Sequence, residues 1–227
     1  MNSRWISTAA SIWIQATTGG SYAFSIYSPA LKSSQSYDQS TLDIISVFKD
    51  IGANAGVISG LLYAAVAVRR GPWVIHALGS VQCFVGYFFM WAAVVGLIAP
   101  PPVPLMCGFI FLAAHAQTFF NTANGFLGLS GAILIQVYQA FFMGSPSTFI
   151  LMLALLPSLV SFSLMFLVRI CSGSRLDDKR YLNGFSILAL VLAAYLMMHH
   201  IGEHFCVFKM GTPCYHSWSL NIAFFAS

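Results

Sequence analysis

Residues 71–168 form a run of 98 residues that contains no Asp, Glu, Lys or Arg. A soluble domain carries charge on about 25% of its residues, because its surface must be hydrated. A helix that crosses a bilayer needs about 20 apolar residues, so this run alone has room for four such helices. Over the whole chain 58% of residues are hydrophobic and 7% are charged. We therefore expect an all-α membrane protein, a polytopic helical bundle.

Prolines, glycines and charges divide the apolar sequence into seven segments. Each is predicted to be a helix, because backbone polar groups in lipid must be satisfied within the segment. Residues 1–168 are predicted to form a six-helix bundle, followed by a basic loop at 169–183, a partial seventh span at 184–200 and a disordered tail at 201–227. The spans of the bundle are predicted at 5–27, 42–66, 73–98, 103–123, 125–142 and 148–168.

The basic residues predict an orientation, because loops rich in Lys and Arg stay in the cytoplasm. Arg4, the loop 67–72 and the loop 169–183 alternate with connections that are poor in Lys and Arg. This pattern places the N-terminus and both basic loops in the cytoplasm. The first apolar segment has no convincing cleavage site, so we expect it to be retained as a span.

The composition argues against several classes of function. The net charge is +4, but the basic residues lie at span ends, so no nucleic-acid partner is expected. The chain lacks H-E-x-x-H, G-x-S-x-G and P-loop motifs, so no enzyme is expected. The His and Cys residues between 199 and 216 match no standard zinc spacing, and neither a metal nor a cofactor is expected. Cys83 and Cys107 are expected to pack as small apolar side chains.

The second predicted span has a row of small residues and an apolar row. Gly52, Gly56 and Gly60 recur every four residues, a doubled G-x-x-x-G pattern that lets two helices approach closely. The fifth span has a similar packing row at Gly125, Gly128 and Gly131. The apolar row of the second span is predicted to face lipid, and comprises Ile44, Val47, Phe48, Ile51, Ala55, Ile58 and Leu62.

Lys49 and Asp50 are full charges inside this apolar segment. An unpaired charge at mid-helix costs about 2.5–3.5 kcal/mol to insert. Neighbouring residues on a helix point about 100° apart, so the two are not expected to form an ideal ion pair, and each is expected to face the bundle interior with a partner of its own or with water. Asp43, Asp50 and Asn54 share a polar face. Two interpretations stay open: the charges reach the membrane interface along their stems, or Lys49 or Asp50 forms an anion or proton site.

Polar residues also share faces on the first and fourth spans. Gln15 and Tyr22 belong to a polar stripe on the first span, and Gln117 and Asn121 lie on one face of the fourth. These residues either pack against neighbouring helices or line a cavity for water or solute. His115 has no acid close in sequence, so a hydrogen-bonded packing role is expected for it.

Several blocks of this sequence resemble one protein family. They include WIQATTGGSYAFSIYSPALKSS, SVFKDIGANAGVISGLLY, PPVPLMCGFIFLAAHAQTFFNTAN and DDKRYLNGFSILALVLAAYLM, within a resemblance that runs from about Arg4 to Met198. These blocks resemble the plant nodulin-like family of the major facilitator superfamily, which is related to bacterial oxalate/formate-type antiporters. The resemblance implies a transporter of two six-helix halves, each built from inverted three-helix repeats. It also implies that the first, second, fourth and fifth spans line the cavity.

The sequence departs from that family in three places. It stops after about seven spans, so the second half is absent. FFNTAN runs directly into GFLGLSG, which leaves almost no turn between the fourth and fifth spans. After His199 the sequence no longer resembles the family, and residues 201–227 form an atypical tail.

The resemblance therefore implies the N-terminal half of a transporter for a small solute, with an organic anion as the candidate. Lys49 is the candidate for binding the charge of the solute. The alternative is a truncated membrane protein that does not transport and that pairs with or regulates a longer relative. In both cases the lipid bilayer surrounds the chain, and a second copy or a full-length relative would complete the fold. The candidate solute-binding residues are Lys49, Asp50, Gln15, Tyr22, Asn54, Gln117 and Asn121.

Overall fold

The computed structural model describes residues 3–67, 71, 73–120 and 127–167. It also describes five single helical residues within the predicted seventh span: Ile187, Val191, Ala194, Tyr195 and Met198. The chain separates into two units, Met1–Ser172 and Gly173–Ser227, and nearly all described residues belong to the first. The predicted loop 169–183 and tail 201–227 lie outside the described residues.

The first predicted span is not one continuous helix. It consists of the helix α1 (Ser3–Ala16), the 3-10 segment η1 (Gly19–Ala23) and the helix α2 (Phe24–Gln35). At the end of α1 the hydroxyls of Thr17 and Thr18 donate to the carbonyls of Ile14 and Gln15, each at 2.9 Å. Such local hydrogen bonds compete with the helical ladder, so the α-helix stops at this point.

The predicted loop at 28–41 is wrong for most of its length. α2 continues to Gln35, and the connection to the next helix is reduced to residues 36–38. Ser28 and Leu31 are buried where α2 packs against α6 and α9, so tertiary contacts keep this polar stretch helical. Ser36 then ends the helix in the left-handed conformation, with φ 54°.

The second predicted span is helical but interrupted. It comprises α3 (Gln39–Asn54), α4 (Gly56–Leu62) and the π-helical turn η2 (Tyr63–Ala67), with the interruption at Ala55. Asp38 caps α3, since its carboxylate accepts a hydrogen bond from the N–H of Thr41 at 2.8 Å.

The remaining helices lie close to their predicted positions. They are α6 (Trp73–Val95), α7 (Val103–Phe120), α8 (Leu127–Val137) with the π-helical turn η4 (Tyr138–Phe142), and α9 (Pro146–Leu164). Among the described residues, four helical stretches are long and apolar enough to cross a bilayer: Gln39–Val66, Trp73–Val95, Val103–Phe120 and Pro146–Leu164. The expected polytopic all-α fold is confirmed.

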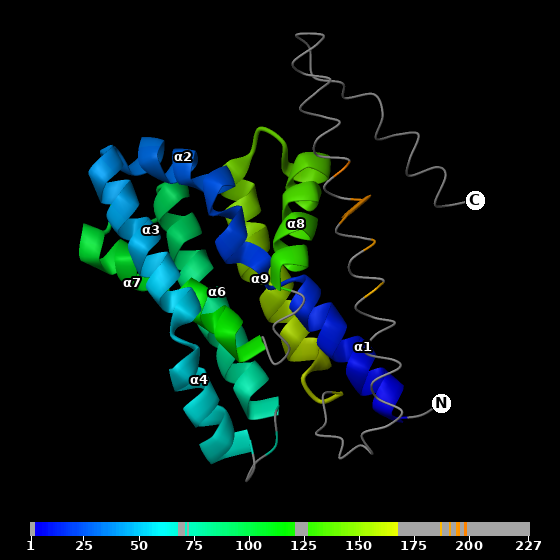
Figure 1. The fold of residues 1–227 in the computed structure, drawn as a ribbon. Coiled ribbons are helices and arrows are strands. Elements are labelled where there is room, and N and C mark those ends of the chain that lie inside the picture. The colour runs from blue at the N-terminus through cyan, green and yellow to red at the C-terminus, as the bar shows by residue number, and fades with distance from the viewer. Residues whose placement is uncertain are drawn as a thin grey trace. The chain divides into compact units, whose positions relative to one another are not determined.

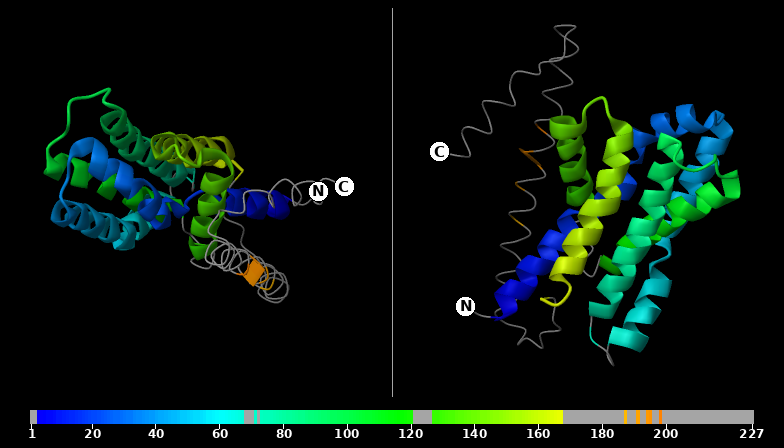
Figure 2. Two further views of the ribbon diagram at one scale, coloured as in Figure 1. Left: turned by 90° about the horizontal axis from the view of Figure 1, so that it is seen from above. Right: turned by 180° about the vertical axis from the view of Figure 1, so that it is seen from behind.

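α6 holds the first unit together, because it packs against both α7 and α9. α3 lies along α7, and α8 lies against η1 (Figure 1). Seen from behind, α9 lies between α1 and α6 (Figure 2). The α2–α3 and α8–α9 connections lie at one end of the bundle, and the start of α1 and the end of α4 lie at the other (Figure 1). Which end faces the cytoplasm stays a prediction.

The predicted glycine row of the second span packs at one position only. A Cβ on Gly52 would lie 2.6 Å from the carbonyl oxygen of Phe111, so a side chain there would separate α3 from α7. No described atom lies within 4 Å of a Cβ added to Gly56 or Gly60, so these two glycines pack against no described part of the chain and their packing role stays a prediction. The interruption at Ala55 explains the difference, because it ends the helical register that would align the three glycines.

Most members of the row predicted to face lipid are exposed on the surface of the first unit. Ile44, Val47, Phe48, Ile51 and Ile58 are 40–55% exposed. Only 17% of the span Gln39–Val66 is buried, against 39–56% for the other three. Cys83 and Cys107 are buried free thiols, as their expected packing role requires.

Candidate functional site

The break in the first span leaves backbone groups that need hydrogen-bond partners, because lipid offers none. Gln117 on α7 supplies them. Its amide nitrogen donates to the carbonyl of Thr18 at 2.9 Å, and its amide oxygen accepts from the N–H of Ser21 at 3.0 Å. The hydroxyl of Ser21 also lies 3.0–3.1 Å from the amide. The amide is assigned this orientation because both its nitrogen and its oxygen then have hydrogen-bond partners.

Helices on three sides hold η1 in place. The hydroxyl of Tyr87 on α6 lies 3.4 Å from the amide of Gln117 on α7, and a Cβ on Gly20 would collide with that hydroxyl. A Cβ on Gly19 would overlap the backbone nitrogen of Gly131 on α8. Gly131 in turn packs against η1, since a Cβ added to it would lie 2.7 Å from the Cβ of Tyr22.

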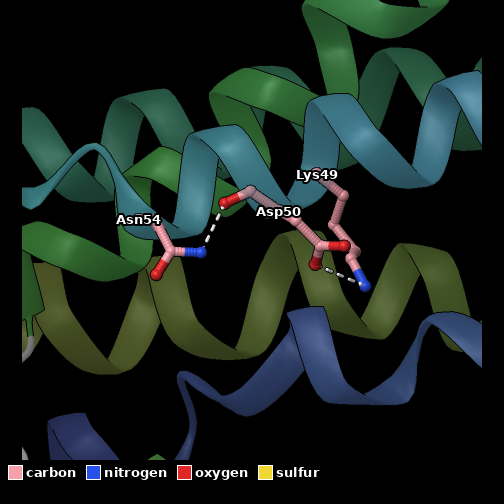
Figure 3. A network of polar contacts seen from close by, with 3 residues as sticks. All are labelled: Lys49, Asp50 and Asn54. Carbon is pink, nitrogen blue, oxygen red and sulfur yellow. Dashed lines mark hydrogen bonds and ion pairs between the residues drawn. The ribbon is translucent and has the colours of Figure 1, made fainter.

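Lys49 and Asp50 form an ion pair with each other. Nζ of Lys49 lies 3.0 Å from Oδ1 of Asp50, the only ion pair within the described ranges. The expectation that adjacent residues point too far apart to pair is wrong here, because the long stem of Lys49 bends back to the neighbouring carboxylate (Figure 3). Nζ also lies 5.1 Å from the centroid of the Phe24 ring, within cation–π range.

The two partners differ in exposure. The Lys49 side chain is 15% exposed and the Asp50 side chain is 63% exposed. The expectation that both face the bundle interior is right for Lys49 and wrong for Asp50. Asn54 is exposed and donates to the backbone carbonyl of Asp50 at 2.8 Å rather than to its carboxylate (Figure 3). Asp43 is also exposed, so the predicted polar face lies on the surface of the unit.

A path of contacts connects Lys49 on α3 with Gln117 on α7. The Phe24 ring lies 5.4 Å from the Tyr27 ring, edge to face, and Tyr27 lies 6.3 Å from Tyr87 in the same geometry. Tyr87 in turn contacts the amide of Gln117. Tyr27 and Tyr87 are 0% and 2% exposed, so the path runs through the core.

Other predicted site residues do not meet Lys49 in any described contact. Gln15 is buried within α1, and Tyr22 on η1 is 53% exposed. Asn121 and Gly125 lie outside the described residues, as do the surroundings of Gly128. The structure therefore brings together only Lys49, Asp50 and Asn54, with Gln117 at the far end of the path.

His115 has the packing role that was expected. Its Nδ1 lies 2.9 Å from the amide nitrogen of Gln82 on α6, and its ring stacks on Phe111. Its Nε2 is buried without a hydrogen bond among the described atoms.

Sequence reasoning missed Ser21, Phe24 and Tyr87. The signal for the break was present, since Thr17 and Thr18 precede two glycines inside an apolar run, a pattern that interrupts helices. No sequence signal pointed to Phe24, which lies opposite the polar stripe in an unbroken helix. Phe24 contacts Lys49 because the first span is interrupted before it and α2 begins at this residue.

Comparisons with known proteins agree with this fold. A family model described as Nodulin-like matches residues 4–124 and 123–222. The chain is 26% identical to Protein NUCLEAR FUSION DEFECTIVE 4 of Arabidopsis thaliana, in an alignment that covers 86% of this chain and 38% of that protein. The chain thus spans less than two fifths of this relative. No solved structure matches.

The extent of the family match corrects one expectation. The match continues to residue 222, so the stretch after His199 is part of the family and does not depart from it. The two matched stretches overlap at residues 123–124, at the boundary between the fourth and fifth predicted spans. With the match extending over nearly its whole length, the chain belongs to the nodulin-like family.

Proposed function

We propose that this chain is half of a major facilitator-type transporter for a small organic anion, and that Lys49 pairs with the negative charge of the solute. The observation that carries the proposal is the charged side chain of Lys49, which is only 15% exposed within a helical stretch long and apolar enough to cross a membrane. Its described partners are an adjacent carboxylate and one aromatic face. Membership of the nodulin-like family supports a role in transport across a membrane.

The geometry of the pair favours exchange of its anionic partner. Residues at adjacent helix positions do not face each other, so the pair forms only by bending the lysine stem. A buried lysine left without a partner is strongly destabilised, so a solute that displaces Asp50 must bring an anion in its place. Because Asp50 is 63% exposed, a solute carboxylate can replace it at Lys49 without leaving a buried charge unpaired.

Oxalate and acetate are suitable probes, tested on the full chain in lipid nanodiscs. We expect 10 mM of a binding anion to slow acetylation of Lys49 by acetic anhydride, read by mass spectrometry. Lys32, which donates to Gln39 at 2.9 Å at the end of α2, is the internal control and should be unaffected. Lys49→Met should weaken binding of radiolabelled anion by about tenfold or more, the size of one lost charged hydrogen bond, and Lys49→Arg should retain most of it.

Lys32→Met is the matched control and should bind like the unaltered chain. Equal binding by Lys49→Met and the unaltered chain, together with unprotected Lys49, would overturn the proposal. Uptake of the same anion into proteoliposomes then tests transport. It is measured at a low protein density, where single copies dominate, and at a high density that favours two copies.

The exposed polar face favours a second candidate, a membrane protein that does not transport and that pairs with a second copy or a longer relative. Asp43, Asp50 and Asn54 are exposed on the least buried of the four spans. Charged groups at membrane depth need a partner or water. Stable dimers in nanodiscs, seen by single-molecule photobleaching, combined with no anion binding would favour this candidate over transport.

A further inference from the structure

We infer that Gln117 is a positioning residue for the Lys49 site and does not contact the solute. The inference rests on the proposed function, since it assigns a role relative to the Lys49 site. It also corrects the sequence interpretation of Gln117 as a solute-binding residue.

The first argument is that the hydrogen-bonding capacity of Gln117 is already used. The side chain is 4% exposed. Its nitrogen donates to the carbonyl of Thr18 and faces the hydroxyl of Ser21, and its oxygen accepts from the N–H of the same serine. An amide has two donors and two acceptor sites, so a solute would have to displace the backbone of η1 to bind here.

The second argument is that the backbone held by Gln117 at Ser21 is close in sequence to Phe24, the residue whose ring contacts Lys49. Ser21 lies three residues before Phe24, which is one turn of a 3-10 segment. A hydrogen bond that fixes the backbone at Ser21 therefore also fixes the start of α2, where Phe24 lies. The Phe24 ring is the face over which the Lys49 ammonium sits, with 5.1 Å between Nζ and the centroid.

A second route links the same residues and does not pass through η1. Tyr87 lies 3.4 Å from the Gln117 amide through its hydroxyl and contacts Tyr27 through its ring, and Tyr27 contacts Phe24. Gln117 thus acts on Phe24 along the backbone and through the aromatic core. Loss of the amide would let η1 shift and would uncover the ammonium.

The experiment compares Gln117→Met with Gln136→Met, both in the full chain in nanodiscs and without solute. Gln136 on α8 is a matched control, because its Oε1 is buried without a hydrogen bond among the described atoms. One readout is hydrogen exchange of residues 17–23, and the other is the rate of Lys49 acetylation. For Gln117→Met we expect about tenfold faster exchange, the effect of losing roughly 1.4 kcal/mol of local protection. Lys49 acetylation should also be several-fold faster.

Further variants make the test specific to positioning. Phe24→Leu should raise Lys49 acetylation as much as Gln117→Met does, without faster exchange at residues 17–20. Gln117→Glu keeps an acceptor for the Ser21 N–H but loses the donor to the Thr18 carbonyl, so exchange at residues 17–20 should stay faster than in the unaltered chain. If Gln117→Met does not fold, Tyr87→Phe removes one hydroxyl from the same amide and should give a smaller change in the same direction.

Faster exchange with unchanged Lys49 acetylation would overturn the inference, because Gln117 would then only stabilise the break. Unchanged exchange would overturn it as well. The proposed function is tested separately, because hydrogen exchange and Lys49 acetylation are measured here without solute. It fails if oxalate and acetate do not protect Lys49 in the unaltered chain.

Discussion

At the scale of single residues, three of the described polar side chains (Gln35, Cys83 and Gln117) hydrogen-bond to the backbone of another element of the bundle. Pro157 lacks an N–H and so leaves the carbonyl of Leu153 without its helical partner. The thiol of Cys83 lies 3.9 Å from that carbonyl oxygen and donates to it. Gln35 donates to the carbonyl of Ala93 at 2.8 Å, near the end of α6. Gln117 follows the same pattern at the first span, so an inward-facing polar residue is weak evidence for solute binding here.

Asp38 provides a test of capping that depends on pH. Hydrogen bonds from the hydroxyl and N–H of Thr41 and from the hydroxyl of Ser40 lower the pKa of Asp38 from 3.8 to about 2. Because the folded pKa is depressed, the contribution to stability is complete above about pH 4 and is lost as the pH falls towards 2. Asn at position 38 can cap the helix but does not titrate. The Tm measured in detergent should therefore fall less between pH 5 and pH 2.5 for Asp38→Asn than for the unaltered chain. An equal fall in Tm for the variant and the unaltered chain would contradict this role of the Asp38 carboxylate.

The ion pair should be weakly coupled, because one partner is largely exposed. Exposed pairs contribute about 0.2–1 kcal/mol. A double-mutant cycle with Lys49→Met and Asp50→Asn, measured by unfolding in detergent, should give a coupling free energy within that range. A coupling above about 3 kcal/mol would mean that Asp50 is held too firmly for a solute to replace it.

At the scale of elements, the apolar runs and the prolines, glycines and charges between them predicted the positions of the helices but not their interruptions. The α6, α7 and α9 segments have uniform apolar sequence, and their predicted and observed bounds agree within a few residues. The break after Thr18 is held by the Gln117 side chain of α7, which lies distant in sequence. Periodicity within one segment carries no information about such partners.

The glycine row gives an element-scale test with a built-in control. Gly52→Ala places a methyl group 2.6 Å from the carbonyl oxygen of Phe111 and should destabilise the bundle by about 1–3 kcal/mol. Gly60→Ala meets no described atom within 4 Å and should be neutral or stabilising by up to about 1 kcal/mol. The check is the unfolding free energy of both variants in the same detergent. Equal losses would show that Gly60 also packs.

At the scale of the whole molecule, the sequence predicted the class of protein well and the site only in part. The charge-free run left no alternative to a membrane bundle, since no soluble surface can be built without charge. Lys49 was identified because a charge inside an apolar helix is conspicuous. Its pairing with Asp50 and its contact with Phe24 required the bent lysine stem and the broken first span, and neither follows from spacing.

The orientation can be tested by cysteine labelling in a background without native cysteines. Ser36→Cys and Ser145→Cys lie in the two connections at one end of the bundle, and Trp73→Cys lies at the start of α6 at the other end. If the basic loops are cytoplasmic, a membrane-impermeant maleimide added to intact cells should label the first two and leave the third unlabelled. Labelling of Trp73→Cys alone would reverse the orientation.

The interruption of the first span between α1 and α2, which is held by hydrogen bonds from Gln117, has a consequence for biosynthesis. The partners of Thr18 and Ser21 come from Gln117, and the backbone neighbour of Gly19 is Gly131, so both are translated about 100 residues later. While the ribosome is still making the intervening chain, the nascent first span has no such partners, and a continuous helix is its best-satisfied state in lipid. We therefore expect the span to enter the bilayer unbroken and to unwind only after the fourth and fifth spans arrive, which makes late rearrangement a step of its maturation.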